Sequence, residues 1–326
     1  MRVSLLLLLY AVVLATVGAA LLRRAWWVQR APRLGILAWQ VLTGSIVASA
    51  LLAGLALAVP SLPIAATLAE FAHACVTLIQ AQYATPAGVA TATTGLVIVG
   101  AVVGRLAFCM VQGARAAATE RRRHRRALAL VGRPEHRLGA IVIPHDVPEV
   151  YCLPGRRRRI VLTSAALDTL SADQLAAVLA HERAHLRARH DLVIAAASAL
   201  AQAFPRVPPF ALAHDQIRRL VELAADDVAA GSSDRLMLAE GILTVAGGHT
   251  PPAALGAGST AGAARVRRLL APRHRLGVLG SVVVSAALAA VLAIPVWLAV
   301  SPAVAAADAI ACPLPPAFEP STQPSS

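Results

Sequence analysis

Four long apolar segments dominate the pattern of hydrophobic and polar positions along this chain. They cover residues 3–22, 34–59, 87–111 and 276–300, and only Arg105 interrupts the third segment, near its end. Each segment reaches the roughly 20 residues that an α-helix needs to cross the hydrocarbon core of a bilayer. The first could serve as a signal peptide, but it has no A-x-A-like cleavage site and a second full span follows it. We therefore predict four transmembrane helices.

The stretch between the third and fourth spans, residues 113–275, has the shorter periodicities of a folded domain. Its first half predicts β-strands at residues 138–144, 149–154 and 159–163, with Pro154-Gly155 as a turn. A capping-box pattern at Ser171 and Gln174 predicts the start of one continuous helix, residues 172–190. Further helices are expected at residues 192–204 and 210–230, the latter stopped by Gly231, and a Gly/Ala/Pro-rich loop at residues 247–262. The pattern indicates an α+β domain large enough to bury a core.

The placement of arginine predicts how the spans are oriented. The formal net charge is +13, the chain is 57% hydrophobic, and its 30 basic residues are all arginine. Arginines are dense in residues 23–33, 115–126 and 265–275 and absent from residues 60–86 and 301–326. Arginine-rich connections stay in the cytoplasm. We therefore expect a cell-membrane protein with three spans in residues 1–112, a cytoplasmic domain in 113–275, a fourth span in 276–300 and a short, disordered outer tail in 301–326.

The basic excess also bears on the partners. An excess of this size favours anionic lipid headgroups or nucleic acid. The run RAAATERRRHRR directly follows the third span, so the membrane accounts for its position. We expect contact with membrane lipid and no direct nucleic-acid binding.

The four cysteines are too scattered for a C-x-x-C metal site. Any zinc in this chain must therefore use histidine and carboxylate ligands. Cys75 and Cys312 fall on the same predicted outer side, where they either form a disulfide or remain unpaired.

The chemistry of the predicted domain centres on an H-E-x-x-H motif, His181, Glu182 and His185, in the helix expected at residues 172–190. Two histidines four residues apart lie one turn apart on the same helix face, with Cβ atoms about 5–6 Å apart. That spacing lets both imidazoles reach one zinc ion, with the adjacent glutamate as general base for a water molecule. The alternative is a solvated helix with incidental histidines. Apolar residues before the motif favour a buried helix behind a cleft.

Zinc needs a third protein ligand, and the sequence offers two candidates. Asp191 follows closely, but it requires a sharp helix break near Ala188, where alanine favours a continuous helix. Neighbouring His190 is expected to point off the ligand face. The other candidate is Glu222, with Asp226 one turn later on the same face, placed to hold a ligating histidine by its other ring nitrogen. A solvated helix face that balances nearby arginines is the alternative reading of these acids.

The motifs YCLPG, IVLT and L-S-x-x-Q-L-x-A-V-L-A-H-E-x-A-H, followed by E-x-x-x-D, resemble the BlaR/MecR-type antirepressor membrane metallopeptidases. These are gluzincins related to the HtpX-type membrane proteases, and the resemblance covers about residues 130–275 with the flanking spans. It implies a cytoplasm-facing zinc endopeptidase with one Zn²⁺ per chain. It also implies zinc ligands at His181, His185 and Glu222, a general base at Glu182 and an outer carboxylate at Asp226.

The chain departs from the relatives in two places. In HtpX-like proteases a late His-Pro and a downstream arginine help to stabilise the oxyanion. Arg265 is the candidate here, but no His-Pro precedes it, and lipid contact is its alternative role. The β-lactam sensors carry a large penicillin-binding domain after the last span, whereas this sequence continues for only about 25 residues. We expect the signal to be sensed by another protein, or by the spans and residues 60–86.

The sequence thus predicts an α-helical membrane protein with a cytoplasmic α+β zinc metalloprotease domain of gluzincin type. A protein substrate is expected to lie extended along an edge strand near residues 150–153, next to the arginine run 156–159. By resemblance, the substrate is a winged-helix repressor, or the chain itself. A quality-control protease for membrane proteins would use the same chemistry. A non-catalytic receptor on a protease fold is the remaining alternative, and the intact H-E-x-x-H with Glu222 argues against it.

Overall fold

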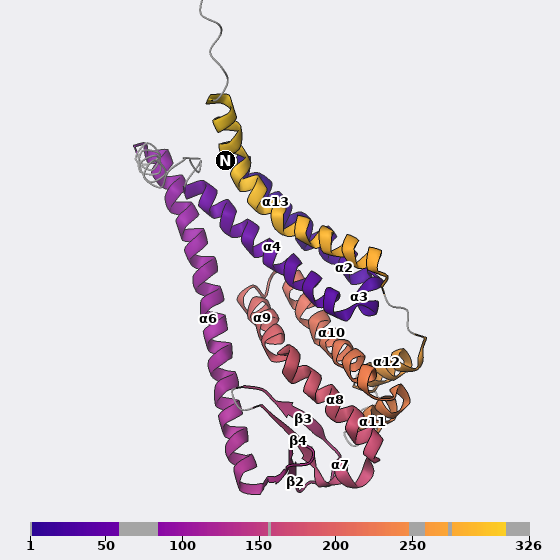
Figure 1. Cartoon of the computed structure of the whole chain (residues 1–326). Helices are drawn as coiled ribbons and strands as arrows, with labels where there is room; N and C mark the ends of the chain where they lie inside the picture. The colour runs from indigo at the N-terminus through magenta and orange to yellow at the C-terminus, as the bar shows by residue number, and fades with distance from the viewer. Residues whose placement is uncertain (1, 59–83, 156–157, 248–257, 273–275, 311–326) are drawn as a thin grey trace, which may run out of the picture. The chain divides into compact units, whose positions relative to one another are not determined.

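The computed structural model describes residues 2–58, 84–155, 158–247, 258–272 and 276–310 (Figure 1). Within these ranges, four helices are long and apolar enough to cross a membrane: Arg2–Arg24, Pro32–Ala58, Pro86–Val131 and Val278–Ser301. They coincide with the four predicted spans. The predicted orientation of the spans stays a prediction, because helix length and hydropathy do not show which end of a span faces the cytoplasm.

The chain forms two compact units, and each is best considered by itself. The first unit contains Met1–Val12, Ser45–Ala101 and Leu292–Ser326. Its described elements are α1 (Arg2–Val13), most of α4 (Pro32–Ala58), the start of α6 (Pro86–Val131) and the end of α13 (Val278–Ile310). Helices α4 and α6 approach closely where Gly54 faces Gly95: a Cβ atom on Gly95 would overlap the Gly54 carbonyl oxygen and lie 2.9 Å from the Ala58 nitrogen. Small residues permit such close packing of membrane helices.

Helix α6 is longer than the predicted third span. It continues without a break from Pro86 through the arginine-rich stretch to Val131, 46 residues in all. Alanine and arginine are both strong helix formers, so the charged stretch has no local reason to end the helix. Arg105, the charge within the predicted span, donates from Nε to the Ala203 carbonyl oxygen at 3.2 Å, which ties α6 to another helix of the second unit.

The second unit, Val13–Gly44 and Val102–Val291, contains a four-stranded sheet. Its strands are β1 (Arg133–Glu135), β2 (Ala140–Ile143), β3 (Val150–Leu153) and β4 (Arg159–Thr163), in the order β1-β2-β4-β3. Strands β2 and β4 are parallel and the other pairs antiparallel. The three predicted strands are present and β1 was not foreseen. Strand β3 pairs only with β4, so it forms one edge of the sheet.

The two faces of the sheet are covered by different helices (Figure 1). On one face, Leu128 of α6 packs with Leu153 and Val161. On the other face, Val150 and other strand residues pack against α7 (Ser164–Thr169) and α8 (Ala172–Ala188). Alternate residues of a strand point to opposite faces, which is how β3 contributes to both cores.

The remaining helices of the second unit lie before the sheet and after α8 in the sequence. They are η1 (Leu14–Gly18, a π-helix), α2 (Ala19–Arg24), α3 (Trp27–Arg30), α9 (His190–Ala203), α10 (Pro208–Ser232), α11 (Arg235–Gly247) and α12 (Gly258–Leu270). The predicted capping box is present: the Ser171 hydroxyl oxygen accepts from the Gln174 backbone N–H at 3.3 Å, and Gln174 Oε1 accepts from the Ser171 N–H at 3.0 Å.

Four local predictions need correction. The helix expected over residues 172–190 is broken at Arg189, which has a left-handed backbone with φ of 52°. Gly231 does not stop α10, which ends at Ser232. Residues 258–262 begin helix α12 instead of ending a loop. Helices α7 and α11 were not foreseen. Helix α13 continues to Ile310, so the disordered tail predicted over residues 301–326 is wrong for residues 301–310. The possible Cys75–Cys312 disulfide and the rest of that tail, residues 311–326, lie outside the described residues.

Candidate active site

The H-E-x-x-H motif lies on α8, the helix between the sheet and α10. His181 and His185 are one turn apart, and their Nε2 atoms are 3.0 Å from each other. His181 is buried, with 6% of its surface exposed, as are the apolar residues Ala177 and Val178 before it. The motif is therefore part of a packed helix, and the alternative of a solvated helix with incidental histidines is wrong.

Glu222 comes to the two histidines from α10. One carboxylate oxygen lies 3.6 Å from His181 Nε2 and the other 3.6 Å from His185 Nε2. One ligand atom from each of the three residues lies within 4.8 Å of the others. Glu222 directly follows buried Leu220 and Val221, which fix α10 in the core, while its own side chain is 38% exposed. Burial raises the pKa of Glu222, but the hydrogen bond to His181 and the charge of Arg265 outweigh this and lower it.

Asp226 lies behind His181, on the side away from Glu222. Its carboxylate is fully buried, and Oδ1 is 2.9 Å from His181 Nδ1 in a close but bent contact. A proton on Nδ1 in this contact leaves the Nε2 lone pair directed at His185 and Glu222. Burial lowers the pKa of His181, whereas its hydrogen bonds to Asp226 and Glu222 raise it to about 9. His181 is therefore protonated on both nitrogens at neutral pH without a metal ion, and a metal at Nε2 would displace that proton.

Arg265 of α12 joins the two carboxylates. Its Nε and Nη2 donate to Asp226 at 2.9 and 2.7 Å, and its Nη1 lies 3.1 Å from Glu222 Oε2. Burial raises the pKa of Asp226, but these bonds from Arg265 and that from His181 lower it to about 2. The Arg265 side chain is 20% exposed. In this position Arg265 neutralises the acids of the site. The oxyanion role predicted for it stays a prediction.

Glu182 follows His181 on α8 and lies close to both the ligand residues and the edge strand β3. It interacts with the thiol and the backbone of Cys152, on β3. Burial raises the pKa of Glu182, although the charge of His181 and the hydrogen bond from Cys152 act in the opposite direction. Burial and the neighbouring Glu182 raise the pKa of the Cys152 thiol to about 12, so this cysteine stays protonated. A desolvated carboxylate with a raised pKa is suited to proton transfer near neutral pH.

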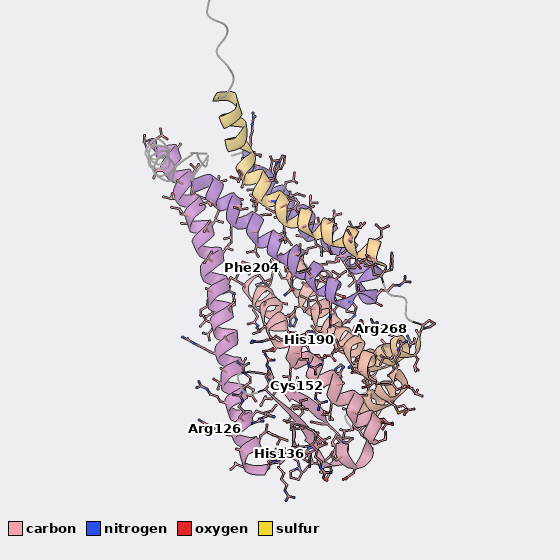
Figure 2. All side chains as sticks on the ribbon, viewed as in Figure 1. Arg126, His136, Cys152, His190, Phe204 and Arg268 are labelled. Atoms are coloured by element: carbon pink, nitrogen blue, oxygen red, sulfur yellow. The ribbon has the colours of Figure 1, made fainter. Side chains whose placement is uncertain are left out.

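His190 belongs to the site, contrary to the expectation that it points off the face. The break at Arg189 turns the chain so that His190 Nδ1 lies 3.0 Å from His185 Nδ1. His190, the first residue of α9, is labelled in Figure 2. His190 is buried, and one of the two Nδ1 atoms must carry the proton between them. Burial and the charge of His181 lower the pKa of His185 to about 4, so it is neutral. His190 thus faces the outer nitrogen of His185 as Asp226 faces that of His181.

Asp191 is not among the three residues whose ligand atoms converge. The predicted reason for its absence was nevertheless wrong, because the helix does break two residues before it. The break turns His190, and not Asp191, toward His185.

Comparison with known proteins identifies one related family. A model of peptidase family M48 matches residues 114–208. The match covers the second half of α6, the sheet, and α7 to α9 with the H-E-x-x-H motif, while Glu222, Asp226 and Arg265 lie beyond it. No curated protein and no solved structure matches the chain. The matched segment is thus similar to peptidase family M48, and the match does not single out the BlaR/MecR-type antirepressors.

Proposed function

We propose that this protein is a membrane-embedded, zinc-dependent endopeptidase. The observation that carries the proposal is the convergence of His181, His185 and Glu222 ligand atoms within 4.8 Å, with Glu182 next to His181 on α8. Two neutral imidazole nitrogens and one carboxylate are a frequent ligand set of catalytic zinc. The match to peptidase family M48 supports the same reaction class.

The residues present fit a zinc ion. His181 and His185 would bind it through Nε2, because their Nδ1 atoms face Asp226 and His190. Glu222 would bind through its carboxylate, which Arg265 holds by Nη1 at 3.1 Å. Zinc, when bound, supplies Lewis acidity that polarises a carbonyl group and makes water more acidic.

Glu182 performs the proton transfers of the proposed reaction. Its carboxylate takes a proton from a water molecule while the water oxygen attacks the carbonyl carbon of the peptide bond. It then gives this proton to the leaving amine nitrogen, and the carbon–nitrogen bond breaks. The products are one new carboxyl group and one new amino group. Burial keeps the pKa of Glu182 above that of an exposed glutamate, which makes it a better base.

The edge of β3 is the proposed binding surface for the substrate backbone. Strand β3 has β4 on one side and no strand partner on the other among the described residues. Cys152 of this strand interacts with Glu182, so a peptide added along β3 would pass the proposed base. Extended peptides commonly bind to free sheet edges in this way.

The proposed location of the catalytic unit is the cytoplasmic side of the cell membrane, on the basis of the arginine distribution. Its substrates would then be cytoplasmic or membrane proteins. We propose a regulatory role, in which a transcriptional repressor of the winged-helix type is cut, because of the resemblance to the antirepressor peptidases. Quality control of membrane proteins would require the same site and differs only in substrate.

The experiment that tests this function compares cells that carry the wild type with cells that carry Glu182→Gln, by quantitative proteomics of new protein N-termini. Glutamine keeps the shape of the side chain and cannot accept the proton from water. Asp191→Asn, a change of the same kind outside the proposed ligand set, is the matched control. New N-termini that depend on Glu182 but not on Asp191 are expected, and their protein of origin separates a repressor from damaged membrane proteins. Identical N-termini in all three strains would rule out peptidase activity.

A further inference from the structure

Five arginines line a cavity of the second unit. Arg121, Arg122 and Arg125 of α6, Arg158 beside β4, and Arg189 between α8 and α9 surround a volume of about 530 Å³. We call this cavity the arginine pocket. Gly155, in the turn that follows β3, also lines it. None of the described residues that line it is acidic.

The charge of the arginine pocket is not compensated within the described part of the chain. None of its five arginines forms an ion pair with a described carboxylate, whereas Arg265 and Arg268 each pair with acids. Arg125 donates only to a backbone oxygen, that of Pro154, at 3.2 Å, and its Nε has no partner. Like charges gathered in a concave wall repel one another and attract an anion. Guanidinium groups bind carboxylates and phosphates through paired hydrogen bonds.

The backbone conformation at Arg189 is a second indication that the arginine pocket is a functional site. Arg189 is the one non-glycine residue with positive φ in the described chain, at 52°. Positive φ is unfavourable for a residue with a Cβ atom, and such residues concentrate at functional sites. The turn places Arg189 in the wall of the pocket and the next residue, His190, against His185.

The arginine pocket lies at a defined distance from the proposed base. Arg189 directly follows α8 and is seven residues after Glu182, which corresponds to about 10 Å along the helix axis. Cys152 interacts with Glu182, and Gly155, in the turn after β3, is three residues further along the chain, at most about 10 Å away. The two estimates, one along α8 and one along β3, both place the arginine pocket about 10 Å from the proposed base. A peptide extended along β3 would therefore have about three residues between the cleaved bond and the arginines.

The position of the pocket on α6 argues against a lipid headgroup as its ligand. The apolar part of α6 ends near Val111, and Arg121 is ten residues further, about 15 Å along the axis. The headgroup layer on each side of a bilayer is only about 5–8 Å thick. If α6 crosses the membrane, the pocket lies beyond that layer, in water.

We propose that the arginine pocket is a substrate subsite that selects acidic side chains about three residues from the cleaved bond. This rests on the proposed peptidase function. The substrate class it adds is a protein with an acidic cluster next to an extended segment.

The test uses the full-length protein in uncharged detergent and two fluorescein-labelled decapeptides of alanine, valine and serine. One carries an adjacent pair of glutamates and the other a pair of glutamines at the same positions. Fluorescence anisotropy with the Glu182→Gln protein measures binding without cleavage. We expect the glutamate peptide to bind about tenfold more tightly, the value of one good charge-assisted contact. Arg122→Glu with Arg158→Glu should abolish this preference, because both side chains are exposed and line the pocket.

The matched control is Arg123→Glu with Arg126→Glu, which reverses two exposed charges on the same stretch of α6 outside the pocket. Arg126 is labelled in Figure 2. It should keep the preference for glutamate. Equal binding of the two peptides, or equal loss in both double variants, would overturn the subsite. If phosphatidylglycerol micelles displace the glutamate peptide from the wild-type protein but not from the pocket variant, the arginine pocket binds lipid. That result would also overturn the substrate subsite. Cleavage of the glutamine peptide by the wild type, followed by mass spectrometry, reports the peptidase function separately.

Discussion

Replacement of Asp226 by asparagine probes the support of the proposed metal site. The aspartate is fully buried and accepts two hydrogen bonds from Arg265, while its Oδ1 lies 2.9 Å from His181 Nδ1. Asparagine keeps the volume and one oxygen but removes the negative charge. Arg265 would then retain only Glu222 as a charged partner. Loss of one partner from a buried ion pair costs about 3–5 kcal/mol, and the remaining oxygen of asparagine favours the lower end of that range.

The same change should weaken zinc binding. Loss of the outer hydrogen-bond partner of a ligating histidine typically lowers metal affinity by about 10- to 100-fold. Competition with a coloured zinc chelator measures the affinity, and chemical unfolding of the metal-free protein in detergent measures stability. Asp227→Asn is the matched control, because Asp227 is 44% exposed and pairs only with Arg268, outside the site. If Asp226→Asn and Asp227→Asn bind zinc with the same affinity as the wild type, Asp226 does not support a metal ligand.

Three other predictions follow from the structure. His190→Leu should lower zinc affinity by about tenfold, because leucine removes the nitrogen that faces His185. His190→Asn should restore part of that affinity. Equal zinc affinities of the wild type and His190→Leu in the competition assay would show that His190 does not support the metal site. Removal of metal by a chelator should abolish peptide cleavage and zinc should restore it, as measured with a fluorogenic peptide; activity that persists in metal-free protein would contradict the proposed chemistry. A reporter enzyme fused after Ala84 should be active outside the cell and one fused at Ser232 inside, and the reverse pair would invert the proposed orientation.

The sequence predicted the parts of the site that depend on local geometry. His181, Glu182 and His185 occupy one turn of α8, and helix periodicity alone places the two histidines together. Glu222 and Asp226 are likewise one turn apart on α10. The four apolar helices were predictable for a similar reason, since length and composition are properties of one segment.

The sequence did not predict the helix break at Arg189, nor the contacts between segments that are distant along the chain. Arg189 has no glycine or proline signal for a helix break, so its positive φ, and with it the position of His190, was hidden from the sequence. Arg265 was named from the family resemblance, but its ion pair with Asp226, 39 residues away in the chain, was not foreseen. The arginine pocket collects side chains from α6, the strand turn and the α8–α9 junction, which only the fold brings together.

The most direct measurement of the central claim is the zinc content of purified Glu222→Ala, Glu182→Ala and Asp191→Ala proteins, with peptide cleavage assayed on the same samples. We predict that Glu222→Ala loses both zinc and activity, because one of the three converging ligand atoms is gone. Glu182→Ala should retain zinc and lose activity, and Asp191→Ala should retain most of both. Full zinc occupancy in Glu222→Ala together with its loss in Asp191→Ala would contradict the account.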